Sequence, residues 1–197
     1  MRLVLTTPPA TEPLSVEDAK TQVNVDGAHF DGIIADMIAS ARDEAERVTG
    51  RSLITQTLAL YMDCWPSEGF IRLPRGPVQS VTSVVYRSPD GTATTLAADQ
   101  YQVSIAGPVA RVAPAYGCSW PSLRGTMDDV VVTYVAGYGD ADDVPAGIVS
   151  AVRMIFGAFY ANREDFVTGT IATPLPLSSA RLLGKFRLPF VIVPVNE

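Results

Sequence analysis

Apolar residues recur with helical spacing in two stretches that lie far apart in the chain. The first is Asp31–Thr49, and the second spans residues 145–161 and begins at Pro145, a residue that the first turn of a helix tolerates. In each stretch the apolar positions follow at steps of one, three and four, so they share one stripe of a helix. The first stripe contains Ile33, Ile34, Met37, Ile38, Ala41, Ala45 and Val48, and the second contains Ile148, Val149, Val152, Ile155, Phe156 and Phe159. Because each stripe needs an apolar partner, the two long helices are expected to pack on each other.

A shorter helix is predicted at residues 16–23. Ser15 followed by Asp18 resembles a capping box, with the acidic residue standing in for Glu. Asp26-Gly27 is expected to end this helix, and Gly50 stands where a left-handed cap would end the first long helix. Two opposite-charge pairs at a spacing of four are expected on the other faces of that long helix: Arg42 with Glu46, and Asp43 with Arg47.

Between residues 52 and 135 the apolar period changes to two, which is typical of strands. The strand-like runs are 53–61, 70–73, 78–87, 101–105 and 129–135. Asp90-Gly91 indicates a hairpin turn between two such runs. The order of elements predicts an α+β fold with an antiparallel core of two long helices and an inserted small, mostly antiparallel β-sheet region.

The end of the chain has a different pattern. Residues 168–179 hold prolines and small polar residues, as linkers do, and a short helix is expected over Ser179–Leu183, ended by Gly184. The apolar run Phe186–Val195 contains prolines that exclude it from a central strand. We therefore expect a core of residues 1–165 and an extended C-terminal arm of residues 166–197. Apolar side chains of the arm either fold back onto their own subunit or dock on a partner.

Charge separates these two regions as well. Of the 197 residues, 47% are hydrophobic and 18% charged, which suits an assembly with buried subunit contacts or a well-packed small domain. Residues 1–165 carry 12 basic and 20 acidic side chains, net −8, whereas residues 166–197 are net +2. The overall charge of −6 argues against general binding to nucleic-acid phosphates.

Neither the start of the chain nor its apolar runs indicate a membrane protein. No apolar stretch approaches the roughly 18 residues of a membrane span, and no signal peptide is recognised. We expect a cytosolic protein with Cys64 and Cys118 as reduced, part-buried thiols.

Several motifs come close to catalytic or binding sites without completing one. Gly137-Tyr138-Gly139 lacks the third glycine of a dinucleotide loop and is followed by Asp140, Asp142 and Asp143, which would repel a pyrophosphate. These aspartates lack the spacing of a calcium loop and suit a helix-capping turn. Asp128 and Asp129 lie at the entry to a strand, and we expect them at a solvated strand edge and not in a general acid–base pair.

The other incomplete motif is Gly117-Cys118-Ser119-Trp120-Pro121, which has half of a nucleophile elbow. His29 is the only histidine and hence the only histidine base for Ser119 or Cys118. The structural interpretation, a loop anchored to the sheet by Trp120, is favoured. We therefore expect no enzyme activity, no catalytic residue, no metal site and no cofactor.

The order of these elements resembles the head–tail connector (adaptor) proteins of long-tailed bacteriophages and gene transfer agents, over the chain from Thr7-Pro8-Pro9 to Phe190. The residues that carry the resemblance are Glu46-Arg47-Val48-Thr49-Gly50-Arg51, Leu73-Pro74-Arg75-Gly76-Pro77-Val78, Val81 to Tyr86, Pro89-Asp90-Gly91 and Tyr160-Ala161-Asn162-Arg163-Glu164. These motifs are structural rather than catalytic.

The resemblance implies a structural subunit that is made in the bacterial cytoplasm and lies at the head–tail joint of a virion or virion-like particle. About twelve copies would form a ring between the portal protein and the next tail component, a stopper or head-closure protein, and DNA would pass through without specific binding. Connector proteins of this kind hold the portal with C-terminal segments, which here implies Arg181, Lys185, Phe186, Arg187, Leu188, Phe190, Val191 and Ile192. The alternatives are a small hydrolase that uses Ser119 or Cys118 with His29, and a generic oligomeric scaffold.

Overall fold

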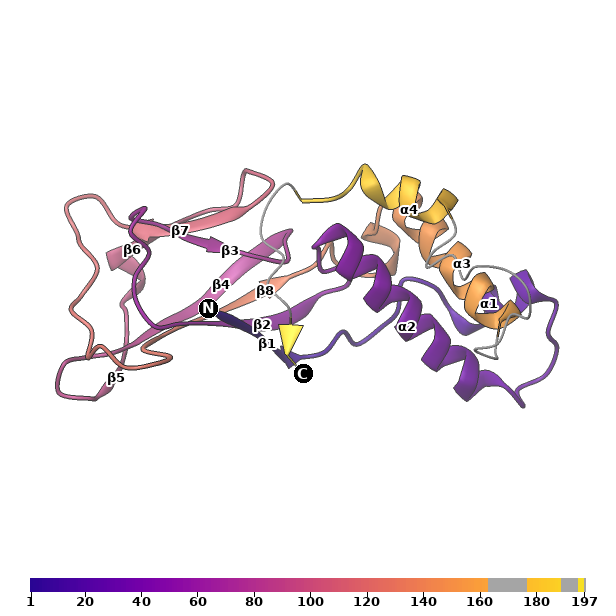
Figure 1. Cartoon of the computed structure of the whole chain (residues 1–197), viewed down its shortest axis with the longest axis horizontal. Coiled ribbons are helices and arrows are strands. Elements are labelled where there is room, and N and C mark those ends of the chain that lie inside the picture. The colour runs from indigo at the N-terminus through magenta and orange to yellow at the C-terminus, as the bar shows by residue number, and fades with distance from the viewer. Residues whose placement is uncertain (163–176, 189–194, 197) are drawn as a thin grey trace. The chain divides into compact units, whose positions relative to one another are not determined.

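The computed structural model describes residues 1–162, 177–188 and 195–196 (Figure 1). The chain forms two compact units, and neither is made from one continuous segment. The sheet unit comprises Met1–Ala10, Gly50–Tyr138 and Leu188–Glu197, and the helical unit comprises Thr11–Thr49 and Gly139–Arg187. The division predicted from the sequence, a core of residues 1–165 and an arm of 166–197, has other boundaries and stays a prediction.

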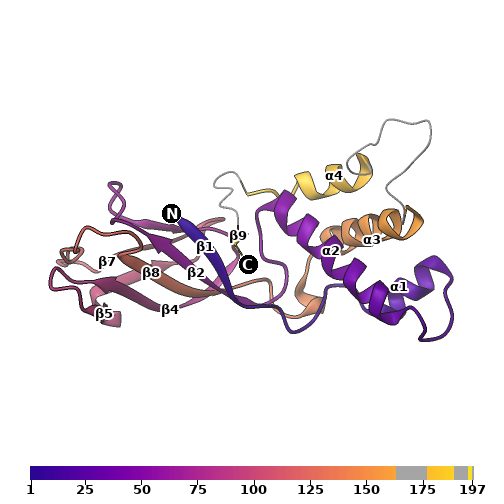
Figure 2. The same cartoon turned by 60° about the horizontal axis from the view of Figure 1, so that its bottom comes forward.

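The sheet unit contains a six-stranded sheet in the order β5-β4-β8-β2-β1-β9 and a three-stranded sheet in the order β3-β7-β6 (Figures 1 and 2). The strands are β1 (Arg2–Thr7), β2 (Gln56–Met62), β3 (Ile71–Leu73), β4 (Val78–Arg87), β5 (Ala93–Thr95), β6 (Tyr101–Ser104), β7 (Ala110–Pro114), β8 (Val130–Ala136) and β9 (Val195–Asn196). Among these strands only the pairing of β1 with β9 is parallel. The predicted α+β fold with mostly antiparallel sheet is therefore confirmed.

All five predicted strands are present, and four strands were missed. The predicted strand 78–87 has the same bounds as β4, and Asp90-Gly91 forms the expected turn between β4 and β5. The missed strands are β1, β5, β7 and β9. Each of them has six residues or fewer, and the prolines after β1 suggested an extended arm instead. Such short strands are stabilised by pairing with a neighbour, which the sequence pattern does not reveal.

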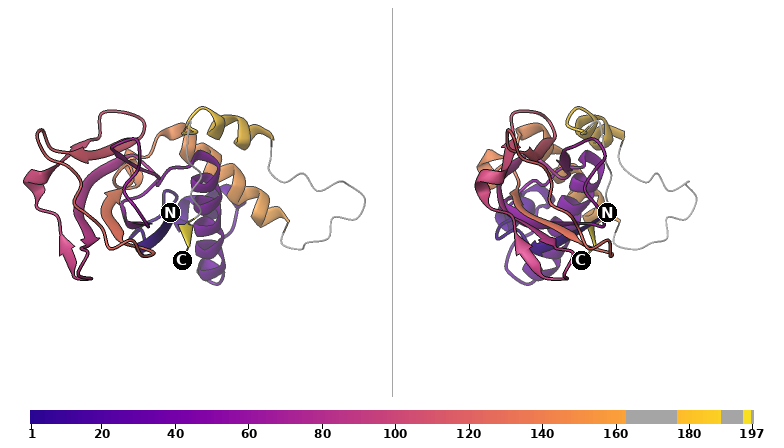
Figure 3. Two further views of the ribbon diagram at one scale, coloured as in Figure 1. Left: turned by 60° about the vertical axis from the view of Figure 1, so that its left-hand side comes forward. Right: turned by 90° about the vertical axis from the view of Figure 1, so that its left-hand side faces the viewer.

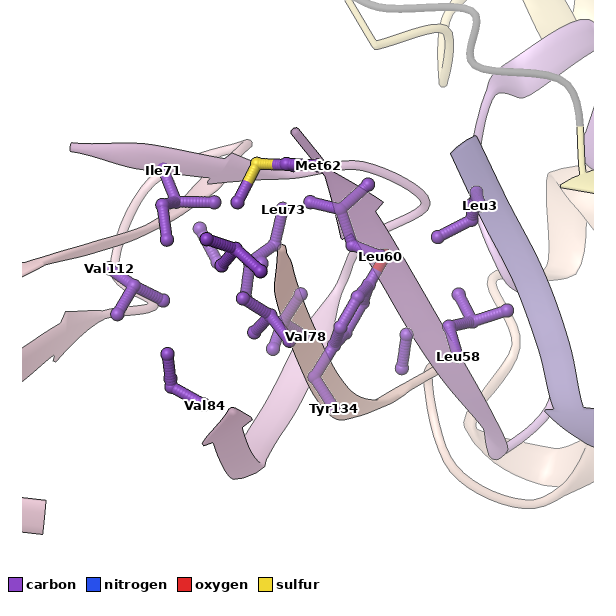
Figure 4. Close-up of a cluster of buried hydrophobic side chains, with 14 of the residues drawn as sticks. Leu3, Leu58, Leu60, Met62, Ile71, Leu73, Val78, Val84, Val112 and Tyr134 are labelled. Carbon is purple, nitrogen blue, oxygen red and sulfur yellow. The ribbon is translucent and has the colours of Figure 1, made fainter. Parts of the chain in front are cut away.

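One hydrophobic core is shared by the two sheets (Figure 4). Along β8 every second residue is buried, because alternate side chains of a strand point to opposite faces. The buried cluster is Leu3, Leu58, Leu60, Met62, Ile71, Leu73, Val78, Val84, Leu96, Ala110, Val112, Val130, Val132, Tyr134 and Ala136. The fully buried Tyr134 hydroxyl donates a hydrogen bond of 2.7 Å to the Pro74 carbonyl oxygen. Burial raises the pKa of this phenol, so it remains a donor at any ordinary pH.

The helical unit consists of α1 (Val16–Val23), α2 (Asp31–Thr49), α3 (Ala146–Ala161) and α4 (Leu177–Gly184) (Figure 3). As expected from the two apolar stripes, α2 packs against α3, and α4 packs against both. The Ser15 hydroxyl accepts a hydrogen bond from the Asp18 N–H, so half of the predicted capping box is present. The helix has the predicted bounds, Val16–Val23, and it is capped by Asn24 in the left-handed conformation, two residues before the predicted Asp26.

Two expectations for α2 were wrong. Ile33, which belongs to the predicted apolar stripe, is 53% exposed. The expected pair of Arg42 with Glu46 is present at 3.7 Å, and both residues are buried. The second expected pair is wrong, because Arg47 pairs with Glu44 and Asp43 pairs with Arg42. The segment before α1 supplies the reason, because the Glu12 carboxylate lies 2.8 Å from the Arg42 guanidinium and covers this face of α2.

Charge pairing keeps Arg42 ionised in this buried position. Burial alone lowers its pKa, but the carboxylates of Glu46, Glu12 and Asp43 raise it above the ordinary value overall. For Glu12 the balance is opposite, since burial raises the pKa of its carboxyl more than the Arg42 charge and hydrogen bond lower it. The arginine thus joins the segment before α1 to α2 through a charge-assisted hydrogen bond.

A buried carboxylate organises the turn that precedes β8. Asp129 is 1% exposed and accepts hydrogen bonds from the Gly125 and Thr126 N–H groups, at 2.6 and 2.7 Å, and from the Thr126 hydroxyl. The Thr126 hydroxyl lowers the pKa of Asp129 most; burial opposes it, and the two N–H groups and Arg87 add to the lowering. The predicted solvated edge is therefore wrong for Asp129, whereas Asp128 is exposed and pairs with Arg2 at 3.2 Å.

Replacing Tyr134 with Phe should destabilise the sheet unit. The change leaves the Pro74 carbonyl without its buried donor, and we expect the free energy of unfolding to fall by about 1–3 kcal/mol. Urea unfolding followed by tryptophan fluorescence measures this unit, because Trp65 and Trp120 both belong to it. Tyr116→Phe, which changes a fully exposed tyrosine of the same unit, serves as the control and should be neutral. Equal stability of the two variants would contradict the expectation.

Replacing Asp129 with Asn should lower stability in a pH-dependent way. A carboxyl whose pKa is lowered on folding stabilises the folded state above its ordinary pKa of 3.8, and this contribution is lost as the pH falls below that value. We expect the urea midpoint of Asp129→Asn to lie below that of the wild type at neutral pH and to converge with it in acid. Asp128→Asn is the control, because Asn tolerates the left-handed backbone there. A difference between Asp129→Asn and the wild type that does not change with pH would argue against the ionised carboxylate.

Candidate functional site

The residues of the possible hydrolase are divided between the two units. Ser119 and Cys118 belong to the sheet unit, in the loop between β7 and β8, whereas His29 precedes α2 in the helical unit. Within the described ranges no hydrogen bond joins His29 to either nucleophile, and the His29 ring contacts the edge of the Phe30 ring. Both Cys64 and Cys118 are exposed, which corrects the expectation of part-buried thiols.

Trp120 anchors the loop, as predicted. Its ring stacks on that of Trp65 with centroids 4.3 Å apart, and its indole N–H donates to the Gly69 carbonyl at 3.3 Å. The Trp65 indole N–H in turn donates to the Pro121 carbonyl at 2.8 Å. These contacts give the Gly117–Pro121 segment a structural role in the sheet unit.

The glycine and aspartate motif after β8 is a structural junction. A side chain at Gly137, whose φ is +126°, would come within 2.4 Å of the Ile54 carbonyl oxygen, so only glycine fits. Asp140 and Asp143 then form a reciprocal capping box around a short 3-10 helix, Ala141–Asp143. This agrees with the predicted capping turn. In the part of the chain that the structure describes, no group of three or more His, Cys, Asp or Glu is arranged to hold a metal ion.

The predicted portal-binding segment is divided between buried and exposed residues. Helix α4, Leu177–Gly184, is longer than the predicted Ser179–Leu183 and ends at the predicted glycine. Leu183 is fully buried in the helical unit, and the half-buried Phe186 ring lies against Gly147, at 3.1 Å from the position of an added Cβ. Leu188 is buried in the sheet unit beside Gly50. Apolar residues of this segment thus fold back onto their own chain.

The basic residues of the same segment face solvent. Arg181, Lys185 and Arg187 are exposed, and across residues 1–162, 177–188 and 195–196 no carboxylate lies within ion-pair distance of any of them. Phe190, Val191 and Ile192, the other predicted portal contacts, lie outside the described residues. The segment therefore presents three cations that have no carboxylate partner among the described residues, on a helix and turn held by Leu183 and Phe186.

A further feature, a pocket of about 250 Å³ on the three-stranded sheet, was not found from the sequence. Its lining comes from β6, β7 and the residue before β3, and consists of Phe70, Gln102, Val103, Ser104, Arg111 and Ala113. The register of the three strands brings these residues together. The sequence did not reveal this, because β7 was not predicted and a long loop separates β3 from β7. The alternation of polar and apolar residues in Ala110–Pro114 was the one available signal.

No helix among the described residues is long and apolar enough to cross a membrane.

Comparison with known proteins gives matches among solved structures. No family model and no curated protein matches the chain. The neck of an empty gene transfer agent (GTA) particle, computed with C6 symmetry, contains a chain 21% identical with a TM-score of 0.80, covering 98% of this chain and 100% of that one. The virion of a native GTA particle contains a chain that is 22% identical with a TM-score of 0.79, and the match covers 98% of each chain. The neck of a native GTA particle, computed with C12 symmetry, contains a chain that is 23% identical with a TM-score of 0.72. This match covers 98% of this chain and 100% of that one.

At these identities the likeness establishes the fold. It extends over both units, since nearly the whole of this chain and of each matched chain is aligned. Over almost its full length, the chain therefore has the fold of chains found in gene transfer agent particles, and the fold expected from the sequence resemblance is confirmed.

Proposed function

We propose that this chain is a structural head–tail connector subunit in the neck of a phage-like or gene transfer agent particle. The observation that carries the proposal is the end-to-end likeness, with TM-scores of 0.72–0.80, to chains in structures of such particles and their necks. Shared domains often match over only part of a chain, whereas here both units match together. The motifs noted in the sequence support the same assignment independently, because they are structural.

The subunit would act in a ring between the portal and the next tail component. Two of the matched neck structures were computed with C6 and C12 symmetry, which supports a ring of about twelve copies. DNA would pass through the ring, and the excess of acidic side chains in residues 1–165 would weaken its attraction to phosphates. A structure of the assembled ring with an arginine-lined channel would contradict this role of the acidic residues.

A structural role fits the chemistry of the described residues better than the two alternatives. A hydrolase needs a base within hydrogen-bond reach of its nucleophile, and His29 belongs to a different unit from Ser119 and Cys118. A generic scaffold has no reason to share the fold of a particle neck protein over its full length. Mass spectrometry of purified particles separates these possibilities, because a connector subunit must be present in particles and a cytoplasmic scaffold must be absent from them.

The portal contact is proposed for the basic side chains of the segment that ends at Leu188. The packing of Leu183 and Phe186 orders the segment, so Arg181, Lys185 and Arg187 lose less entropy when they meet a partner. Cations without a carboxylate partner are complementary to acidic groups, and we assign the acidic partner to the portal. Phe190, Val191 and Ile192 would add apolar contacts to the same partner.

Reversing these three charges tests the anchor without removing buried residues. Deletion of residues 180–197 would also remove the buried Leu183, whereas Arg181→Glu, Lys185→Glu and Arg187→Glu change only exposed side chains. We expect the triple variant to keep its circular dichroism spectrum and to lose at least about tenfold in affinity for the portal, since about 1.4 kcal/mol corresponds to a tenfold change. A pull-down with purified portal protein, at several concentrations, measures the loss.

The matched control changes the same number of charges elsewhere, at exposed arginines whose ion pairs contribute little: Arg47→Glu, Arg124→Glu and Arg153→Glu. The control variant should bind the portal like the wild type. If both triple variants bind equally well, the basic segment is not the portal anchor; if both fail equally, net charge rather than this surface controls binding.

A further inference from the structure

The pocket on the three-stranded sheet combines the Phe70 ring with Arg111, which has no carboxylate partner among the described residues. In the register of this sheet Arg72 is opposite Arg111, and Arg111 is opposite Ser104, so the three side chains lie on one face. Both guanidinium groups lie over the Phe70 ring, at 5.2 Å for Arg72 and 5.5 Å for Arg111. This cation–π contact holds Arg111 at the pocket wall.

The two arginines differ in their charge partners. Arg72 is neutralised by Glu68, whose carboxylate lies 2.7 Å away. Arg111 is exposed and has no carboxylate within ion-pair distance among the residues that the structure describes. Its guanidinium, with five N–H donors, is therefore available to bind a carboxylate that enters the pocket.

The strand that borders the pocket, β6, has an open edge. It pairs with β7 on one side, and no described strand pairs with the other side. The Ala115 N–H donates to the Gln100 carbonyl, so by alternation the backbone groups of Gln102 and Ser104 face β7 and those of Val103 face away. Pro114, which has no N–H to donate, lies opposite Tyr101, and this agrees with the pattern.

Exposed apolar side chains accompany this open edge. Val103 is 39% exposed and Ile105, the next residue but one, is 52% exposed. Neither charge, proline nor a covering element protects the edge within the described residues of β6, although such protection is usual where a strand edge remains in solvent. The edge has the properties of a surface that becomes covered on assembly.

We propose that β6 accepts an extended acidic segment of a second copy of this chain as a fourth strand, with a carboxylate of that segment bound by Arg111. A residue of the added strand that is opposite Ser104 would lie on the same face of the sheet as Arg111. Its backbone would be two strand spacings, about 10 Å, from the backbone of Arg111. Extended arginine and glutamate side chains together span this distance. An apolar neighbour on the same face of the added strand would occupy the pocket beside Phe70.

Charge complementarity identifies the occupant as a second copy. Residues 1–165 carry 20 acidic against 12 basic side chains, so copies of this chain repel one another unless cations are placed at their contacts. Arg111 is such a cation, and most other arginines of the sheet unit already have partners in their own subunit. This inference rests on the proposed ring, in which neighbouring copies must meet.

Self-association of the purified full-length chain tests the inference, measured by sedimentation velocity over a range of concentrations. Arg111→Glu should weaken self-association by at least about tenfold, because it places a carboxylate opposite the incoming one. Arg124→Glu makes the same charge change at another exposed arginine that has no carboxylate within ion-pair distance among the described residues, and it should associate like the wild type.

A second pair of variants tests the strand edge separately. Val103→Pro removes an N–H that faces away from β7, which an edge strand tolerates, and it should weaken association as strongly as Arg111→Glu. Val103→Ala loses the same side chain but keeps the N–H, and it should associate nearly as the wild type. Circular dichroism establishes that each variant is folded, and a misfolded Val103→Pro leaves the decision to Arg111→Glu.

The inference is overturned if the wild type stays monomeric at every concentration, or if folded Arg111→Glu associates like Arg124→Glu. Mass spectrometry of purified particles distinguishes this failure from failure of the proposed function. If wild-type chain is present in particles while the β6 variants associate normally, the connector role stands and copies meet through another surface. If the chain is absent from particles, the connector role itself fails.

Discussion

Burial of the β8 side chains between two sheets is the interaction on which the sheet unit depends. This central strand pairs with β2 and β4, and its inward residues contact side chains from the three-stranded sheet. Tyr134 adds a direction to this otherwise nondirectional packing, because its hydroxyl must reach the Pro74 carbonyl. A buried donor that lost its acceptor would cost more than the bond contributes, so the hydrogen bond selects one alignment of the two sheets.

Polar residues that look catalytic in the sequence serve local structure instead. The Asp129 carboxylate organises a turn, Asp140 and Asp143 cap a short helix, and Trp120 holds the loop that contains Ser119. In each case the side chain forms its hydrogen bonds with residues that are close in sequence or belong to the same unit.

The C-terminal segment illustrates how apolar and basic residues of one short stretch are separated. Leu183 and Leu188 are buried, whereas Arg181, Lys185 and Arg187 remain in water. The apolar contacts order the backbone without burying a charge, because the cations stay hydrated at the surface. Arg111 on the three-stranded sheet follows the same principle, with Phe70 supplying the ordered support.

Local sequence patterns determined the elements whose stability is mostly local. The two long helices, the turn at Asp90-Gly91, the cap at Gly50 and strand β4 could all be predicted, because helical periodicity, turn chemistry and strand alternation act over a few residues. The expectation that the chain has no metal or catalytic cluster came from the single histidine and the incomplete motifs, and it stays a prediction.

Tertiary structure decided everything that depends on a distant partner. Strands β1 and β7 exist because β2, β3 and β6 pair with them, and the burial of Arg42 depends on Glu12, thirty residues earlier. The pocket of Phe70 and Arg111 likewise requires the register of three strands. Pairing and burial are properties of two segments together, and neither segment alone carries the information about which partner it meets.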